Sequence, residues 1–511
     1  MLSGQFHNRL FQLAFGKWRA VRARLARLSP LAAALLALSV AAVAPPSAPI
    51  IAQASPSSGA VFLRKLPSAI LDNQTNSMSV GVDSAGGMHA AFTNFSTDNS
   101  GNYNAYYDYC APGQDCANAA NWTLVNLLTV ASSATIMDST ELAVDSQGRQ
   151  RVVIVTSDFG DPFMDHYYYA ACDSGCTSAA NWAHVDVTDT TSGQNTFIFN
   201  GNKHFFTLDP QGRPRFVLDD GIHYDYVFCD SACTSAGHWS WLALAGQSDT
   251  GQGSNTPALA FNAAGQPRLL APLQNTETFQ TNLNYWECNA NDCGTNATSW
   301  TTVALISPFG GLSAEYSSLR LTHSGQPRFA YYGTPGGSAE TLYYYWCASG
   351  CTSLANWHSH DVGLAPAADF QTAGEEPDLA LDSQDEPRLS FQSLDTTLGN
   401  GLGYAWCNQG CESGSPSWQA KLADPNTQAN ADWDRLPAAG CTSAGWIGAN
   451  RSALVLDKAG NPRIGYDAEH YETNCADPGL NGQDYRSVRF AYFPGNTLPG
   501  PYRLYLPLVK K

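Results

Sequence analysis

The chain has 511 residues, of which 14% are charged, with 44 acidic against 27 basic side chains. The low charged fraction, together with 44 glycines and 23 tyrosines, is typical of an extracellular all-β protein with tight turns. The net charge of −17 repels phosphate backbones and no basic stripe offsets it, which argues against nucleic acid as a partner.

Residues 1–54 predict a signal peptide. Six basic residues between Arg9 and Arg27 precede the apolar run 31–43. That run of about 13 residues is too short to span a hydrocarbon core of about 30 Å comfortably. Ala52–Ala54 forms the preferred cleavage site, and an uncleaved membrane anchor is the alternative. Cleavage removes six of the 27 basic residues and leaves 21 against 44 acidic ones, about −23. We expect a secreted or cell-surface monomer without a membrane span.

Residues 60–493 contain one motif seven times. Each copy has an apolar alternating run, a D-x-x-G turn, a second run and an aromatic run. Six copies continue with a cysteine pair and a tryptophan that opens a last run. The first turn residues are Asp83, Asp145, Asp209, Asn262, Thr322, Asp382 and Asp457. Four short alternating runs between turns predict a four-stranded antiparallel sheet.

Seven such sheets predict a seven-bladed β-propeller, because a lone sheet cannot bury both of its faces. The expected blades are 76–130, 138–188, 202–246, 255–306, 315–363, 375–423 and 450–493. The seventh copy lacks a fourth run, and residues 60–66 form an unpartnered strand-like run before the first copy. We expect that run to complete the last blade and close the ring. Residues 494–511 form a C-terminal tail, interpreted as a sorting element or an extra edge strand.

The 14 cysteines predict disulfides, as in other exported chains. Six pairs lie within their own repeats, and two cysteines remain for a bridge between long loops. The expected bridges are Cys110–Cys116, Cys172–Cys176, Cys229–Cys233, Cys288–Cys293, Cys347–Cys351, Cys407–Cys411 and Cys441–Cys475. A zinc site is the alternative at blade five, where His358 and His360 follow the cysteines, but the other copies lack paired histidines.

Residues that recur in every copy are best explained by the fold. Asp or Asn starts each turn through its side-chain oxygen, and Gly takes the positive-φ position. An arginine six residues after the turn residue packs on the blade's Trp or bonds turn carbonyls. The aromatic residue three before the first cysteine, or Phe490 in the last copy, is expected in the core.

The D-x-x-G turn resembles the Asp-box (BNR) repeat of sialidase-type propellers across the whole repeat region. The Asp-box spaces its Asp and Gly by one residue, whereas two residues separate them here and Pro-Arg often follows. The Arg-Ile-Pro element of sialidases has its nearest counterpart in Arg64-Lys65-Leu66-Pro67, which is one residue too long. No catalytic residue of that family can be placed on this chain. The resemblance implies the fold and leaves the chemistry open.

A ring of side-chain oxygens is the first candidate site. Seven residues before each turn, at the start of strand one, stand Asn76, Asp138, Asn202, Asn255, Glu315, Glu375 and Asn450. Strand one is expected innermost, so these residues would surround the mouth of the central channel. One interpretation is that their side-chain oxygens bind a ligand or Ca²⁺. The alternative is that they form hydrogen bonds with backbone groups where the chain turns into the channel. No other cofactor is expected, since nucleotide and metalloprotease motifs are absent.

The second candidate is a corner formed by two long loops, 424–449 and 467–487. It contains aromatic side chains beside carboxylates, the combination that sugar recognition requires. Its members are Asp432, Trp433, Asp434, Arg435, Trp446, Asp467, Glu469, His470, Tyr471 and Tyr485. A disulfide-stapled cap over the closing seam is the alternative.

Three functions remain open. The first is a non-catalytic recognition module for carbohydrate or an extracellular protein. The second is a sialidase-like glycoside hydrolase, which needs two carboxyl groups about 5–10 Å apart on the variable loop face. The third is a structural scaffold.

Overall fold

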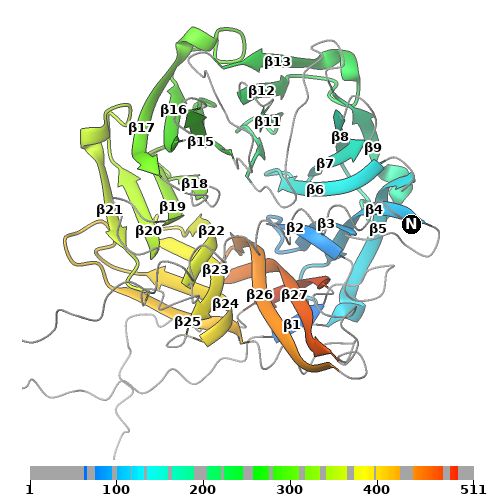
Figure 1. Ribbon diagram of the computed structural model, residues 1–511. Coiled ribbons are helices and arrows are strands. Elements are labelled where there is room, and N and C mark those ends of the chain that lie inside the picture. The colour runs from blue at the N-terminus through cyan, green and yellow to red at the C-terminus, as the bar shows by residue number, and fades with distance from the viewer. Residues whose placement is uncertain are drawn as a thin grey trace, which may run out of the picture. The chain divides into compact units, whose positions relative to one another are not determined.

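The computed structural model describes residues 62–65, 75–94, 101–116, 118–131, 135–158, 164–188, 204–219, 224–244, 257–275, 280–309, 317–333, 341–364, 373–395, 399–425, 441–475 and 484–492. These residues form seven four-stranded antiparallel sheets arranged in a ring (Figure 1). The prediction of a seven-bladed β-propeller is therefore confirmed. The expected signal peptide and the C-terminal tail lie outside the described residues.

The first four blades follow the chain, each starting with its innermost strand. Blade one is β2 (Thr75–Val82), β3 (Met88–Asn94), β4 (Asn102–Cys110) and β5 (Trp122–Ala131). Blade two is β6 (Thr135–Val144), β7 (Gln150–Asp158), β8 (Met164–Cys172) and β9 (Ala183–Asp186). Blade three is β10 (Phe206–Leu208), β11 (Pro214–Asp219), β12 (Tyr224–Cys229) and β13 (Trp239–Ala243). Blade four is β14 (Ala258–Phe261), β15 (Pro267–Asn275), β16 (Gln280–Cys288) and β17 (Trp300–Phe309).

The remaining blades continue the ring. Blade five is β18 (Ser317–Leu321), β19 (Pro327–Gly333), β20 (Thr341–Cys347) and β21 (Trp357–Asp361). Blade six is β22 (Ala373–Leu381), β23 (Pro387–Asp395), β24 (Gly399–Cys407) and β25 (Trp418–Pro425). Blade seven contains β26 (Cys441–Leu456), β27 (Pro462–Cys475) and β28 (Asp484–Tyr492). Short 3₁₀ helices precede the tryptophans of blades one to five: η1 (Ala119–Asn121), η2 (Ala179–Asn181), η3 (Ala236–His238), η4 (Ala297–Ser299) and η7 (Leu354–Asn356).

The ring is closed by β1 (Phe62–Lys65), which pairs antiparallel with β28 and supplies the fourth strand of blade seven. Leu63 lies opposite Ala491, and Arg64 lies opposite Phe490. This pairing confirms the expected closure. It covers the edge of β28, which would otherwise offer unpaired N–H and C=O groups to another chain.

Aromatic pairs join neighbouring blades near their outer edge. In blades one to five the aromatic residue three before the first cysteine contacts the tryptophan that opens the outermost strand of the next blade, and Phe490 of blade seven does the same with blade one. Ring centroids are 4.9–5.7 Å apart in Tyr107–Trp182, Tyr169–Trp239, Tyr226–Trp300, Tyr285–Trp357, Tyr344–Trp418 and, across the closing seam, Trp122–Phe490. These aromatics are core residues, as expected. Their role as links between blades was not visible in the sequence.

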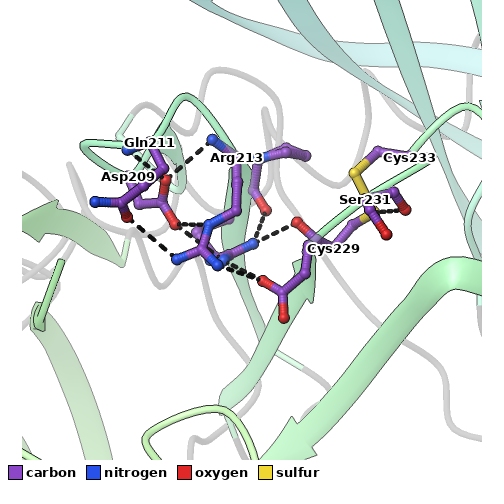
Figure 2. Close-up of polar contacts among 9 residues, drawn as sticks. Asp209, Gln211, Arg213, Cys229, Ser231 and Cys233 are labelled. Atoms are coloured by element: carbon purple, nitrogen blue, oxygen red, sulfur yellow. Dashed lines mark hydrogen bonds and ion pairs between the residues drawn. A yellow bond between two sulfur atoms is a disulfide. The ribbon is translucent and has the colours of Figure 1, made fainter. Parts of the chain in front are cut away.

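The repeated turn and the repeated arginine form one hydrogen-bonded unit, seen for blade three in Figure 2. Asp209 Oδ1 accepts from the backbone N–H groups of Gln211 and Arg213, and Gly212 has a φ of 75°. Arg215 Nη1 donates to the carbonyls of Pro214 and Cys229, and its Nη2 lies 2.9 Å from Asp209. The arginine therefore bonds carbonyls, one of its two expected roles, and ties the first turn to the cysteine turn.

The six expected disulfides within repeats are present, with sulfur atoms bonded across each turn between the third and fourth strands. In blades one to five the following tryptophan donates its indole N–H to the second cysteine's carbonyl at 2.7–2.9 Å. The zinc alternative at Cys347 and Cys351 is therefore wrong, because both sulfurs are oxidised. For the seventh pair only the backbone is described, and β26 and β27 place Cys441 directly opposite Cys475. That bridge stays a prediction.

Candidate functional site

The molecule has two faces of different character. The D-x-x-G turns and the cysteine turns lie on one face, here called the compact face. The starts of strands one and three and the ends of strands two and four lie on the opposite face, here called the loop face. Neighbouring strands in each blade are antiparallel, so the connections of every described blade alternate between the two faces.

Blade seven extends farther toward the loop face than any other described blade. β26 has 16 residues and β27 has 14, whereas the other strands have 3 to 10. The extension contains residues that were expected to belong to loops, so the predicted loops 424–449 and 467–487 are wrong in part. Residues 441–449, 468–475 and 484–487 are strand, because the small and apolar residues of β26 pair in register with β27 (Figure 1).

The register of this extension places candidate residues in rows across three strands. Trp446 pairs with His470, and His470 pairs with Tyr485. Tyr471 and Glu469 stand in the rows on either side. Directly opposed residues in adjacent strands share one face of a sheet. The backbone therefore places Trp446, His470 and Tyr485 on one face of the sheet, and Tyr471 and Glu469, one residue away along β27, on the opposite face.

Asp467 serves the fold rather than an open site. Its side chain is 1% exposed, and its Oδ1 accepts from the backbone N–H of Met78 in blade one at 3.4 Å. Similar hydrogen bonds link other blades at the inner edge. The Ser79 hydroxyl accepts from the backbone N–H of Leu142, and the Ser318 hydroxyl accepts from the backbone N–H of Leu379. Each innermost strand has one edge without a neighbouring strand, and these bonds satisfy some of the backbone N–H groups along that edge. Of the other corner candidates, Asp432, Trp433, Asp434 and Arg435 lie outside the described residues.

The predicted ring of oxygen-bearing residues coincides with a β-bulge wherever its strand is described. Register shifts occur at Asn76 in β2, at Glu375 in β22, at Asn450 in β26 and across Asp138 in β6. A bulge inserts an extra residue and redirects a side chain, which explains why residues that bond locally recur there. The side chains of Asn76, Glu375 and Asn450 are not described, and Asn202, Asn255 and Glu315 lie outside the described residues. A ligand role for the ring stays a prediction.

Asp138 is the one ring member whose contacts are described, and it belongs to a buried carboxyl pair. Ser157 bonds both Asp138 and Asp165, which are 4% and 1% exposed. One hydroxyl proton cannot serve two carboxylates, so one carboxyl must donate to Ser157. Burial raises the pKa of Asp138 well above its usual range; the Ser157 bond opposes this shift and the Asp165 charge adds to it. Burial therefore favours the neutral form of Asp138.

Blade one contributes polar groups beside this pair. Burial raises the pKa of Tyr103, and the neighbouring Asp138 carboxyl, when ionised, is the second cause of that rise. Asn126 Nδ2 and the Thr129 hydroxyl both donate to Asn104 Oδ1, at 2.9 and 2.7 Å. Polar side chains thus line the loop-face half of blades one and two. Sequence reasoning missed this set because its members occur once each and form no motif.

A charged cluster crosses the central channel and was also missed. His204 of blade three lies 2.9 Å from Asp378 of blade six, and Arg320 of blade five lies 3.1 Å from the same carboxylate. Glu141 of blade two lies 4.0 Å from His204. Burial alone would raise the pKa of Asp378, but His204, Arg320 and the Leu454 N–H outweigh it and hold that pKa well below its usual range. The channel is therefore bridged by the contact between His204 and Asp378, which come from blades on opposite sides of the ring, and the other two pairs join adjacent blades.

The described part of the chain provides no evident metal centre or membrane span. It contains no group of three or more histidine, cysteine, aspartate or glutamate side chains placed to hold a metal ion. None of its helices is long and apolar enough to cross a bilayer. The Ca²⁺ site at the channel mouth stays a prediction.

Comparison with known proteins gives no family assignment. No family model and no curated protein matches the sequence. The chain is similar to a protein of unknown function from Dyadobacter fermentans, at 11% identity over 84% of this chain and 99% of that one, with a TM-score of 0.40. It is similar to a mutant of NanB sialidase from Streptococcus pneumoniae, at 12% identity over 84% and 70%, with a TM-score of 0.43. The β-propeller domain of the Trilobed protease from Pyrococcus furiosus gives 7% identity over 82% and 94%, with a TM-score of 0.38. At these values the similarities carry no conclusion about function, and the chain is a seven-bladed β-propeller.

Proposed function

We propose that this protein is a secreted recognition module that binds carbohydrate on its loop face, over blades seven, one and two. The observation that carries the proposal is the row Trp446–His470–Tyr485 on strands that extend beyond the repeat. Aromatic rings bind the apolar faces of sugar rings, while carboxylates and amides bind the hydroxyls. Secretion is supported by six disulfides, which persist in oxidising compartments.

The position of the row also supports a ligand role. Residues repeated in every blade build the scaffold, whereas loops and extensions that differ between blades usually carry binding. The row lies in the one blade that departs most from the repeat. On the adjacent blades, the Asn104 network and the Asp138 pair add hydrogen-bonding groups on the same face.

The test is a glycan-array screen of the purified protein, with and without Ca²⁺. Trp446→Ala should reduce binding at least about tenfold, since loss of a central aromatic anchor costs about 2 kcal/mol or more. The matched control is Leu354→Ala, which removes an exposed apolar side chain (53% exposed) on the compact face. Binding that survives Trp446→Ala would contradict the assigned site, and the absence of any glycan binding would favour an extracellular protein ligand or a scaffold.

The carboxyl pair of blade two favours a second candidate, a glycoside hydrolase. A carboxyl whose pKa is raised by burial, beside a second carboxyl, is what general-acid catalysis requires. Against it, both side chains are almost fully buried and share one hydroxyl, which leaves little room for a sugar between them. Release assays on the bound glycans distinguish the two functions. Turnover that is abolished by Asp138→Asn would show that the protein is a glycoside hydrolase and would contradict the proposed recognition module.

A further inference from the structure

Blade six departs from the repeat at one place on the compact face, beside blade five. Blades one to five have a 3₁₀ helix before the tryptophan, but the turn after Cys411 in blade six has none. The indole N–H of Trp418 consequently lacks the cysteine carbonyl that its counterparts bond. The altered turn, 412–414, faces the outer strands of blade five and forms a cavity with them.

This cavity has a volume of 280 Å³ and is lined by Trp346, His358, His360, Glu412 and the Ser413–Gly414 turn. His358 lies opposite Trp346 in the pairing of β20 with β21, and His360 is two residues farther along β21. Both imidazoles therefore lie on the same face of the strand. The ring centroids of His358 and His360 are 5.6 and 4.8 Å from that of Trp346, so both imidazoles pack against the same indole.

Neither imidazole has a carboxylate partner, a property shared among the described histidines by His184 and His238, but only His358 and His360 lie side by side in a cavity. His89, His166, His204 and His323 each lie within 3.3 Å of an aspartate oxygen. His360 Nε2 is shielded from solvent and makes no hydrogen bond in the described structure. A buried imidazole nitrogen without a partner is uncommon and calls for a ligand.

We propose that His358 and His360 bind a divalent transition-metal ion in this cavity. Neutral imidazole suits Cu²⁺, Ni²⁺ and Zn²⁺, whereas Ca²⁺ and Mg²⁺ require oxygen donors. Alternate residues on a strand place their Cβ atoms about 6.6 Å apart, from which two rings can converge on an ion with N–metal bonds of about 2.0–2.1 Å. Cu²⁺ binds most tightly, because it heads the order of divalent affinities.

The protein supplies two ligands, and water completes the coordination shell. Cys347 and Cys351 are joined in a disulfide and offer no thiolate. Glu412 accepts a hydrogen bond from Arg328 Nε at 2.5 Å, and its carboxylate adds negative charge to the cavity wall rather than a third bond to the ion. A site with two protein ligands agrees with the absence of any three-residue metal cluster among the described residues.

The experiment is Cu²⁺ titration of the purified protein, followed by calorimetry and electron paramagnetic resonance. We expect one site whose spectrum shows splitting from two nitrogen ligands. His358→Ala and His360→Ala should each weaken binding about tenfold or more, since loss even of an outer partner of a metal ligand costs about 10–100-fold. His184→Ala is the matched control, because His184 is exposed on β9, the outermost strand of blade two.

Two results would overturn the proposal. One is binding that persists in the double variant His358→Ala/His360→Ala, which would place the ion elsewhere on the acidic surface. The other is a spectrum with one nitrogen ligand or none in the unmodified protein. Unfolding curves of each variant separate loss of the site from loss of the fold, and His358 is exposed enough for its replacement to leave the blade intact.

Discussion

At the scale of single residues, the repeated side chains form hydrogen bonds with the backbone carbonyls that the turns between strands leave unpaired. Five arginines donate to the carbonyl of the first cysteine in their blade: Arg151, Arg215, Arg268, Arg328 and Arg388. In blade one His89 takes this position and bonds Asp83 and Tyr107. A buried guanidinium tied to carbonyls and a carboxylate contributes to a unique turn geometry more than a surface pair would.

Arg215→Met should lower the free energy of unfolding by about 3 kcal/mol, because it leaves the buried Asp209 with the half-exposed Arg213 as its remaining ion-pair partner and removes the donor that bonds the Cys229 carbonyl. Arg213→Met removes an arginine bonded to the same carboxylate but 38% exposed at its side chain. That control should cost no more than about 1 kcal/mol. Denaturant unfolding measures both, and equal costs would contradict the assigned role of burial.

Asp378 gives a stability that depends on pH. Its folded-state pKa is lowered, so its contribution is present above the unfolded value of about 3.9 and is lost as pH falls below it. Asp378→Asn should therefore destabilise the protein by about 3 kcal/mol at pH 7, and the difference from the unmodified protein should shrink below about pH 4. Thermal unfolding of both proteins at several pH values measures this difference in stability. A difference that stayed constant from pH 7 to pH 3 would show that the charge of Asp378 is not what stabilises the channel cluster.

At the scale of elements, the sequence predicts whatever is repeated and fails where the chain departs from the repeat. Blade number, strand order, the closing strand and six disulfides follow from seven aligned copies, because a sevenfold signal averages out local ambiguity. The sequence predicts loops for the halves of β26 and β27 nearer the loop face, because segments such as Cys441–Ala449 mix small and polar residues and show no strand alternation of their own. The channel cluster was missed because Glu141, His204, Arg320 and Asp378 come from four blades and meet only in the closed ring.

Closure by β1 makes a separate prediction. Leu63→Pro removes a backbone donor from a strand that pairs with β28 alone, so blade seven should lose its outer strand. We expect a loss of about 3 kcal/mol in unfolding free energy, at the upper end for single substitutions, and a tendency to associate through the exposed edge of β28. Ser58→Pro, which precedes the paired segment, is the control. Unfolding and light scattering that matched the control would mean that the ring closes without β1.

At the scale of the whole molecule, the ring combines a uniform scaffold with a few departures from it. Aromatic pairs at the outer edge and hydrogen bonds at the inner edge join one blade to the next. The cluster around Asp378 spans the channel, which agrees with a proposed ligand site on a face rather than in the channel. The extension of blade seven and the polar groups of blades one and two lie on the loop face, where the proposed recognition surface lies.

The most direct test of this account is hydrogen exchange of the protein with and without a glycan identified on the array. The account predicts protection of backbone amides in residues 441–449, 468–475 and 484–487, with little change at the D-x-x-G turns, which belong to the scaffold. Protection confined to the compact face, or spread equally over all seven blades, would contradict a single recognition site on the extension of blade seven.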